Sequence, residues 1–247
     1  MGHDHEHPHE HHDDRHRNPV DFDRYLGKLE SPDREAWQMP DRVVEALGLR
    51  PGDVACDVGA GPGYLALRMA RAVGPKGDVY AIDVDPRMIE VIGRRIHQSG
   101  IENVHPILSR PGRAALPPRR CRVILVVNAF HHFPDGAAYL KKLAARLAAD
   151  GRIVIVDFHR RACPVGPPPE LKISRVGVAA EARRAGLQVV RERRFLPYQY
   201  FLELAPVRAP GRDRARGPSS RREAGARKPR PRARTRGARG RAPPSTR

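Results

Sequence analysis

The fold of this chain is decided by the stretch Asp53-Val54-Ala55-Cys56-Asp57-Val58-Gly59-Ala60-Gly61-Pro62-Gly63-Tyr64. Its first half is a short apolar run of the kind that buried parallel strands show. Three glycines at alternate positions follow, and residues 65–73 then have the apolar spacing of a helix. Glycine permits positive φ and lets backbone N–H groups approach a ligand in front of a helix N-terminus. The unit therefore predicts a nucleotide-binding corner, with an ordinary glycine-rich turn as the alternative.

Two acids narrow this interpretation. Asp57 lies two residues before Gly59, where its carboxylate can face the ammonium group of a ligand. The glycine spacing is Gly-x-Gly-x-Gly, whereas the dinucleotide fingerprint is Gly-x-Gly-x-x-Gly. A second apolar run ends at Asp83, about twenty residues past Gly63, and in doubly wound folds an acid at this strand end accepts hydrogen bonds from ribose hydroxyls.

The glycine motif with its acid, followed by Ile82-Asp83-Val84-Asp85-Pro86, resembles the class I S-adenosylmethionine-dependent methyltransferases. The resemblance covers roughly residues 40–204. It implies S-adenosylmethionine as the cofactor, with its ribose on Asp83 and its adenine on Val84. The methionine end of the cofactor would then be held by Asp57, Gly59, Ala60, Gly61 and Gly63.

Apolar runs alternate with helical patterns along the rest of the chain. Further strands are expected at residues 104–108, 123–127, 153–156, 187–190 and 200–204, and further helices from Pro86, over 135–149 and over 176–185. This alternation predicts an α/β fold with a parallel sheet and helices on both faces. The last two strands are separated by only a short connection at residues 196–198, which favours an antiparallel hairpin. The family resemblance implies a Rossmann-like, doubly wound sheet of seven strands, mostly parallel with an antiparallel last strand.

Candidate catalytic residues follow the fourth and fifth strands. The segment Asn128-Ala129-Phe130-His131-His132-Phe133 resembles that of methyltransferases acting on quinone precursors and other small molecules, where it lies beside the methyl group of the cofactor. His131 or His132 is a candidate general base, or else a structural hydrogen-bond donor. Asp157 ends the fifth strand at the edge where open α/β sheets bind ligands, and it either orients a substrate group or caps the loop.

The chain departs from the family in two places. The loop after the third strand usually offers an acid to adenine, but here it reads Leu108-Ser109-Arg110-Pro111, so the Ser109 hydroxyl or backbone groups are expected to serve. The fourth strand is introduced by Cys121-Arg122 instead of an acid. These departures keep open the alternative of a non-catalytic protein that binds a cofactor or a polyanion.

Composition divides the chain into three parts. Residues 1–17 are a histidine- and acid-rich leader of net charge −3, and residues 208–247 are an Arg/Pro-rich tail of net charge +13. Both lack the apolar residues needed for a core and are expected to be disordered. The methyltransferase domain is expected at 18–207, with a helical lead-in at 18–50 that carries Trp37 as a candidate lid residue.

Each terminal part has more than one interpretation. The leader is a solvated segment or a site for Zn²⁺, Ni²⁺ or Cu²⁺, and no dedicated metal site is predicted. The tail is a non-specific nucleic-acid-binding segment that acts by counterion release, or incidental coding sequence. No apolar run reaches the length of a membrane span, no signal peptide is recognisable, and the three cysteines are widely spaced, so a cytoplasmic location is expected.

The leading hypothesis is an enzyme that transfers a methyl group from S-adenosylmethionine to O, N or C of a small molecule. One alternative is a methyltransferase for RNA or a nucleic-acid-associated protein, recruited by the basic tail. The other is the non-catalytic binding protein.

Overall fold

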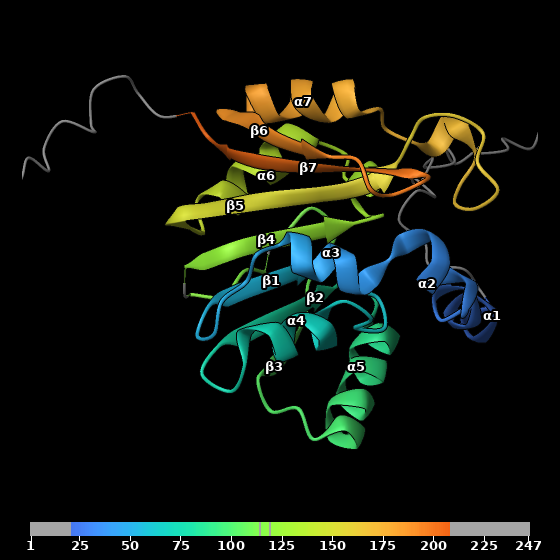
Figure 1. The fold of residues 1–247 in the computed structure, drawn as a ribbon, viewed down its shortest axis with the longest axis vertical. Coiled ribbons are helices and arrows are strands. Elements are labelled where there is room, and N and C mark those ends of the chain that lie inside the picture. Colours follow the sequence, from blue (N-terminus) through green and yellow to red (C-terminus); the bar gives the residue numbers. More distant parts are fainter. Residues whose placement is uncertain (1–20, 114, 119, 208–247) are drawn as a thin grey trace, which may run out of the picture. The chain divides into compact units, whose positions relative to one another are not determined.

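The computed structural model describes residues 21–113, 115–118 and 120–207. Their centre is one seven-stranded sheet (Figure 1). In spatial order its strands are β3 (Val104–Leu108), β2 (Asp78–Asp83), β1 (Val54–Val58), β4 (Cys121–Val127), β5 (Leu147–Phe158), β7 (Gln199–Pro206) and β6 (Leu187–Arg193). Strands β1 to β5 are parallel, and β7 is antiparallel to both of its neighbours. The predicted Rossmann-like sheet is confirmed, whereas the predicted leader 1–17 and tail 208–247 lie outside the described residues.

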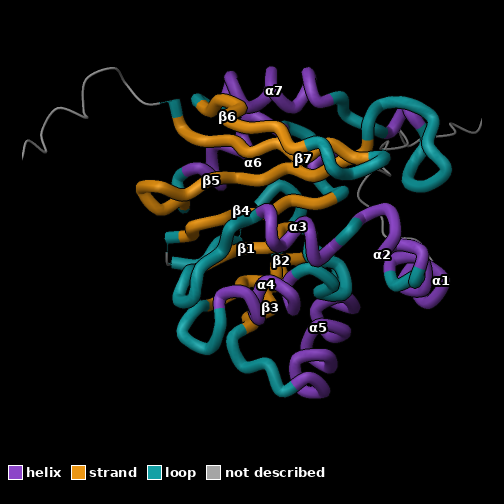
Figure 2. The backbone as a smooth tube through the Cα atoms, in the orientation of Figure 1, coloured by secondary structure: helices purple, strands orange, loops and turns teal. Residues whose placement is uncertain are grey.

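Helices cover both faces of the sheet (Figure 2). Two of them begin at residues that favour a helix start. Pro86 occupies the first turn of its helix, which Asp85 caps with a side-chain oxygen, and Asp135 caps the helix that follows it in the same way. The α-helices are α1 (Phe22–Leu29), α2 (Asp33–Gln38), α3 (Pro40–Ala46), α4 (Ala66–Val73), α5 (Pro86–Ser99), α6 (Gly136–Ala144) and α7 (Arg175–Arg184). Short 3₁₀ turns are η2 (Phe130–His132) and η3 (Pro169–Leu171). Among the described helices, none has both the length and the apolar character needed to cross a membrane.

The core has two layers because successive side chains of a strand point to opposite faces. On β4, Leu125 is buried in the layer formed with α3, α4 and α5, whereas Ile124 and Val126 are buried in the layer formed with α6 and α7. All three are fully buried. This explains why β4 is apolar at every position from Val123 to Val127 instead of alternating with polar residues.

The boundary between α6 and β5 differs from the prediction. The helix expected over 135–149 ends at Ala144, and Leu147 already pairs with Cys121 as the first residue of β5. The register shifts between Cys121 and Val123, which admits the extra residues of β5. Gly151 lies inside this irregular stretch, where a Cβ atom would be 2.6 Å from the Cys121 carbonyl oxygen. The Asp150-Gly151 pair thus belongs to the strand and not to a separate turn.

Replacing Leu125 by alanine tests the central packing. We expect Leu125→Ala to lower the free energy of unfolding by about 2–5 kcal/mol, because it removes a fully buried side chain from a strand with neighbours on both sides. Leu171→Ala is the matched control: that side chain is 53% exposed, and the expected change is within about 0.5 kcal/mol. Urea denaturation followed by circular dichroism measures both, and equal effects would contradict this account of the core.

Candidate active site

The glycine turn between β1 and α4 is shaped by backbone geometry. Gly59, Gly61 and Gly63 have φ of +73°, +53° and +78°, values that other residues rarely adopt. A Cβ atom on Gly59 would lie 2.6 Å from the Ala129 Cβ, so the turn packs directly on the segment that follows β4. The N–H groups of Gly59 and Ala60 both donate to the Ile82 carbonyl, at 2.8 and 3.0 Å. The turn is therefore tied to both neighbouring strands.

Asp83 at the end of β2 makes a further connection to this turn. Its Oδ2 accepts a hydrogen bond from the Gly61 N–H at 2.7 Å, and its Oδ1 accepts one from the Asp85 N–H at 3.0 Å. Burial raises the pKa of the Asp83 carboxyl, and the backbone donors oppose that rise. Beside it, Val84 leaves 43% of its surface exposed, which provides an apolar platform next to a carboxylate.

Asp57 is the second carboxyl group of this corner, and only 2% of it is exposed. Burial, followed by the charge of Asp83, raises its pKa to about 7. Arg34 and the backbone N–H of Ala66 act in the opposite direction. A cation placed next to Asp57 would favour its ionised form, so this position is suited to an ammonium group.

The N-terminal segment packs over the same corner. The buried Arg34 donates from Nη1 to the Leu29 carbonyl at 2.6 Å, and its guanidinium lies 4.4 Å from the centre of the Tyr64 ring. Trp37 packs on Phe158 at the end of β5, with ring centres 5.5 Å apart. Sequence reasoning singled out Trp37 but missed Arg34, because nothing in the local pattern marks this arginine as buried. The lid role of Trp37 stays a prediction.

The structure brings His131 and Asp157 together. His131 Nδ1 lies 2.9 Å from Asp157 Oδ2 and 3.1 Å from Oδ1. Asp157 is fully buried, and its Oδ1 also accepts a hydrogen bond from the Phe158 N–H at 2.8 Å. The ring of the exposed His132 lies beside that of His131, with centres 4.1 Å apart. His131 is therefore oriented by a buried carboxylate.

Two other predicted residues are held by neighbouring groups. Asn128 has a positive φ of 53°, and its Oδ1 accepts a hydrogen bond from Gln199 Nε2 at 2.6 Å. The Ser109 hydroxyl donates to the Arg113 carbonyl at 2.6 Å and accepts from the Ala115 N–H at 3.3 Å. Ser109 thus lies at the end of β3 as expected, with its hydroxyl engaged inside its own loop.

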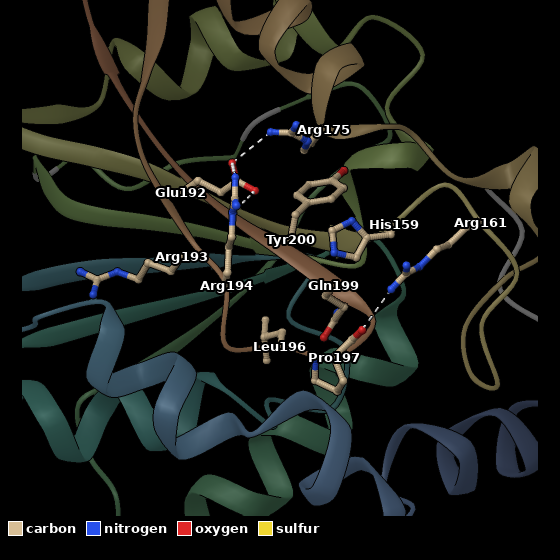
Figure 3. Close-up of a pocket in the computed structure, with 10 residues that line it drawn as sticks. All are labelled: His159, Arg161, Arg175, Glu192, Arg193, Arg194, Leu196, Pro197, Gln199 and Tyr200. Atoms are coloured by element: carbon tan, nitrogen blue, oxygen red, sulfur yellow. Dashed lines mark hydrogen bonds and ion pairs between the residues drawn. The ribbon is translucent and has the colours of Figure 1, made fainter.

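A cavity of about 370 Å³ lies at the β5–β7 side of this edge (Figure 3). Gln199 and Tyr200 of β7 form part of its wall, and they pair with Phe158 and Asp157 of β5. His159 lies beside Tyr200, with ring centres 5.8 Å apart. Sequence reasoning missed this cavity, because its residues come from segments far apart in the chain. Among the described residues, no three side chains of the metal-ligating types form a cluster.

Comparison with known proteins identifies a methyltransferase domain in part of the chain. Residues 55–151 match the family described as "Methyltransferase domain". The protein-L-isoaspartate O-methyltransferase of Pyrococcus horikoshii is 31% identical over 144 residues, which are 58% of this chain and 61% of that protein. The ubiquinone/menaquinone biosynthesis C-methyltransferase UbiE of Vibrio vulnificus is 27% identical over 119 residues, which are 48% of this chain and 46% of that protein.

A solved structure agrees with these matches. The S-adenosylmethionine-dependent methyltransferase from Aquifex aeolicus superposes with a TM-score of 0.69 at 28% identity, covering 74% of this chain and 98% of that one. The chain spans less than two thirds of the length of the two curated relatives, so it shares their domain and not their whole length. Sheet order, glycine turn and matched family together establish that the chain carries a class I S-adenosylmethionine-dependent methyltransferase domain.

Proposed function

We propose that the chain transfers a methyl group to a small-molecule acceptor, with His131 as the general base. The observation that carries the proposal is the contact between His131 Nδ1, in the segment that adjoins the glycine turn, and the buried Asp157 near the end of β5. When bound, S-adenosylmethionine supplies an electrophilic methyl group on its sulfonium sulfur. The residues of the chain bind the cofactor, orient the acceptor and remove its proton.

The glycine corner fits the cofactor in three respects. Asp57 is a buried acid suited to the α-ammonium group, and Asp83 ends the second strand where ribose hydroxyls are bound in doubly wound folds. The exposed surface of Val84 suits an adenine ring. The turn from Gly59 to Gly63, which includes Ala60, brings the backbone close to the methionine end, since the glycines have no side chains in the way. Asn128 completes the proposed binding set together with Ser109, which would contribute backbone groups because its hydroxyl is engaged inside its own loop.

Asp157 gives His131 its proposed role. A carboxylate that accepts a hydrogen bond from Nδ1–H fixes this tautomer of the imidazole and leaves Nε2 as the acceptor. A neutral Nε2 can take a proton from a hydroxyl or from an activated carbon as it attacks the methyl group. The contact of His131 with the buried Asp157 favours His131 as the base over the exposed His132 beside it.

The size of the adjoining cavity favours a small acceptor. Its volume of about 370 Å³ lies within the range of pockets that enclose small ligands. The two curated relatives differ in this respect, because the name of one refers to isoaspartate in proteins and the name of the other to quinone biosynthesis. The acceptor class is therefore proposed from the cavity and not from the relatives.

Cofactor choice can be tested by calorimetry. We expect the chain to bind S-adenosylhomocysteine and not NADH. Asp83→Ala should weaken this binding by about 1.5–3 kcal/mol, because a charge-assisted hydrogen bond is lost. Asp41→Ala is the matched control, since Asp41 is an exposed carboxylate paired with Arg68. Binding of NADH alone would contradict the assignment, and an unchanged affinity of Asp83→Ala would place the ribose elsewhere.

The raised pKa of Asp57, about 7, predicts a pH dependence of cofactor binding. Below that pH the carboxyl holds a proton that the ammonium group must displace. Affinity for S-adenosylhomocysteine should therefore rise with pH between about 5 and 7, by up to tenfold per unit, and then level off. Asp57→Asn should bind more weakly with no such rise, whereas Asp41→Asn should follow the unaltered protein. Parallel pH profiles for all three proteins would refute the role of Asp57.

Replacing the base tests the catalytic proposal. Methyl transfer from radiolabelled S-adenosylmethionine to a panel of hydroxyaryl acceptors should fall by about 10²–10⁴-fold in His131→Gln. Affinity for S-adenosylhomocysteine should stay unchanged, because the imidazole acts on the acceptor. His132→Gln is the matched control and should retain most of the activity. A larger loss in His132→Gln than in His131→Gln would reverse the assignment.

A further inference from the structure

The cavity at the β5–β7 edge is strongly basic (Figure 3). Its lining includes four arginines and a single carboxylate, that of Glu192. An adjoining cavity of about 310 Å³ shares His159, Arg161 and Arg175 with it and has no carboxylate in its lining. The two cavities therefore form one basic recess.

Most of these arginines already have carboxylate partners. Arg175 Nη1 lies 3.0 Å from Glu192 Oε2, and Arg194 Nε lies 3.3 Å from Glu192 Oε1. Arg193 pairs with Glu203 at 2.8 Å. The Arg161 guanidinium differs, because it forms no ion pair with any carboxylate of the described residues, and its Nη2 makes a long contact of 3.5 Å to the Pro197 carbonyl. One Glu192 shared by two arginines, together with the unpaired Arg161, leaves an excess of positive charge facing the recess.

The recess also contains an unsatisfied buried acceptor. Gln199 is 1% exposed, and its Nε2 donates to Asn128 at 2.6 Å. Its Oε1 has no hydrogen-bond partner among the described residues. Leaving such an atom unpaired costs about 1–3 kcal/mol, so a ligand that donates a hydrogen bond here would be favoured. Through its Nε2 contact with Asn128, Gln199 links the wall of the recess to the segment after β4 that carries His131.

We propose that this recess binds an acceptor through a carboxylate or phosphate group on Arg161 and Arg175, with a hydroxyl or amine of the same molecule donating to Gln199. The inference rests on the proposed function and specifies its substrate class. Arginine suits this role, since its guanidinium donates paired hydrogen bonds to planar or tetrahedral anions. With its anionic group on the arginines and its hydroxyl or amine on Gln199, which contacts Asn128, the acceptor would extend toward His131.

Calorimetry with matched probes tests the charge requirement. The full chain, saturated with S-adenosylhomocysteine, is titrated with para-hydroxybenzoate, para-hydroxyphenyl phosphate and the neutral para-hydroxybenzamide. We expect at least one of the anions to bind at least about tenfold more tightly than the amide. The stronger anion identifies the carboxylate or the phosphate as the natural group. Equal binding of all three probes, or no anion binding in the millimolar range, would overturn the proposal.

Matched variants test the residues. Arg161→Gln and Arg175→Gln replace exposed side chains and should each weaken anion binding by about tenfold or more. Arg184→Gln, in the last turn of the same α7 and paired with Glu181, should have no effect. If all three behave alike, the anion binds elsewhere and the proposal is wrong. Titration of the unaltered chain with S-adenosylhomocysteine is a separate readout. Failure to bind it would contradict the proposed function, whereas failure of the anions to bind a chain that does bind S-adenosylhomocysteine contradicts only this inference.

Discussion

The hydrogen bond from the Gly61 N–H to the Asp83 carboxylate is the constraint on which the corner depends. It joins the turn after β1 to the end of β2, at a point where three glycines have positive φ. A carboxylate buried in this position needs backbone donors, because an unpaired buried charge is costly. The other oxygen of this carboxylate, Asp83 Oδ1, accepts a hydrogen bond from the Asp85 N–H, so both oxygens are held and the orientation of the carboxylate is fixed. The corner is thus preorganised by its own backbone.

Much of the fold could be predicted because β1 is apolar except at Asp57 and β4 is apolar from Val123 to Val127, a pattern typical of strands covered on both faces. The glycine spacing and the two acids also located the corner. Few residue types other than glycine adopt the positive φ of the turn, and a buried carboxylate is uncommon outside a binding site. The boundary of α6 was placed wrongly, because Leu147 continues the helical spacing of Leu140 and Leu143 while pairing with Cys121. Local pattern alone cannot distinguish a last helical turn from the first pair of a strand.

Other parts of the site depend on contacts between distant segments. Arg34 is buried by packing against Tyr64, and Gln199 by pairing with β5 and Asn128. The arginines of the recess come from the loop after β5, the start of α7 and the end of β6. Only the antiparallel insertion of β7 between β5 and β6 brings these segments together. A sequence pattern is local, so it marks an arginine as charged but not as one of four around a cavity.

The order of strands also sets the order of chemical groups along the edge. The carboxyl ends of β2, β1, β4 and β5 lie side by side and carry Asp83, Asp57, the His131 segment and Asp157. Because β7 is antiparallel, its first residues, Gln199 and Tyr200, lie at the same edge. Neighbouring strands are about 4.8 Å apart, so the buried acids and the basic recess are separated by only a few strand spacings. The edge thus has acids at one end, a histidine in the middle and arginines at the other end. This arrangement favours a cationic ligand beside the acids and an anionic ligand beside the arginines, with the two ligands meeting at the histidine. Opposite charges at the two ends also disfavour exchange of the two molecules between their sites, because each would then face like charge.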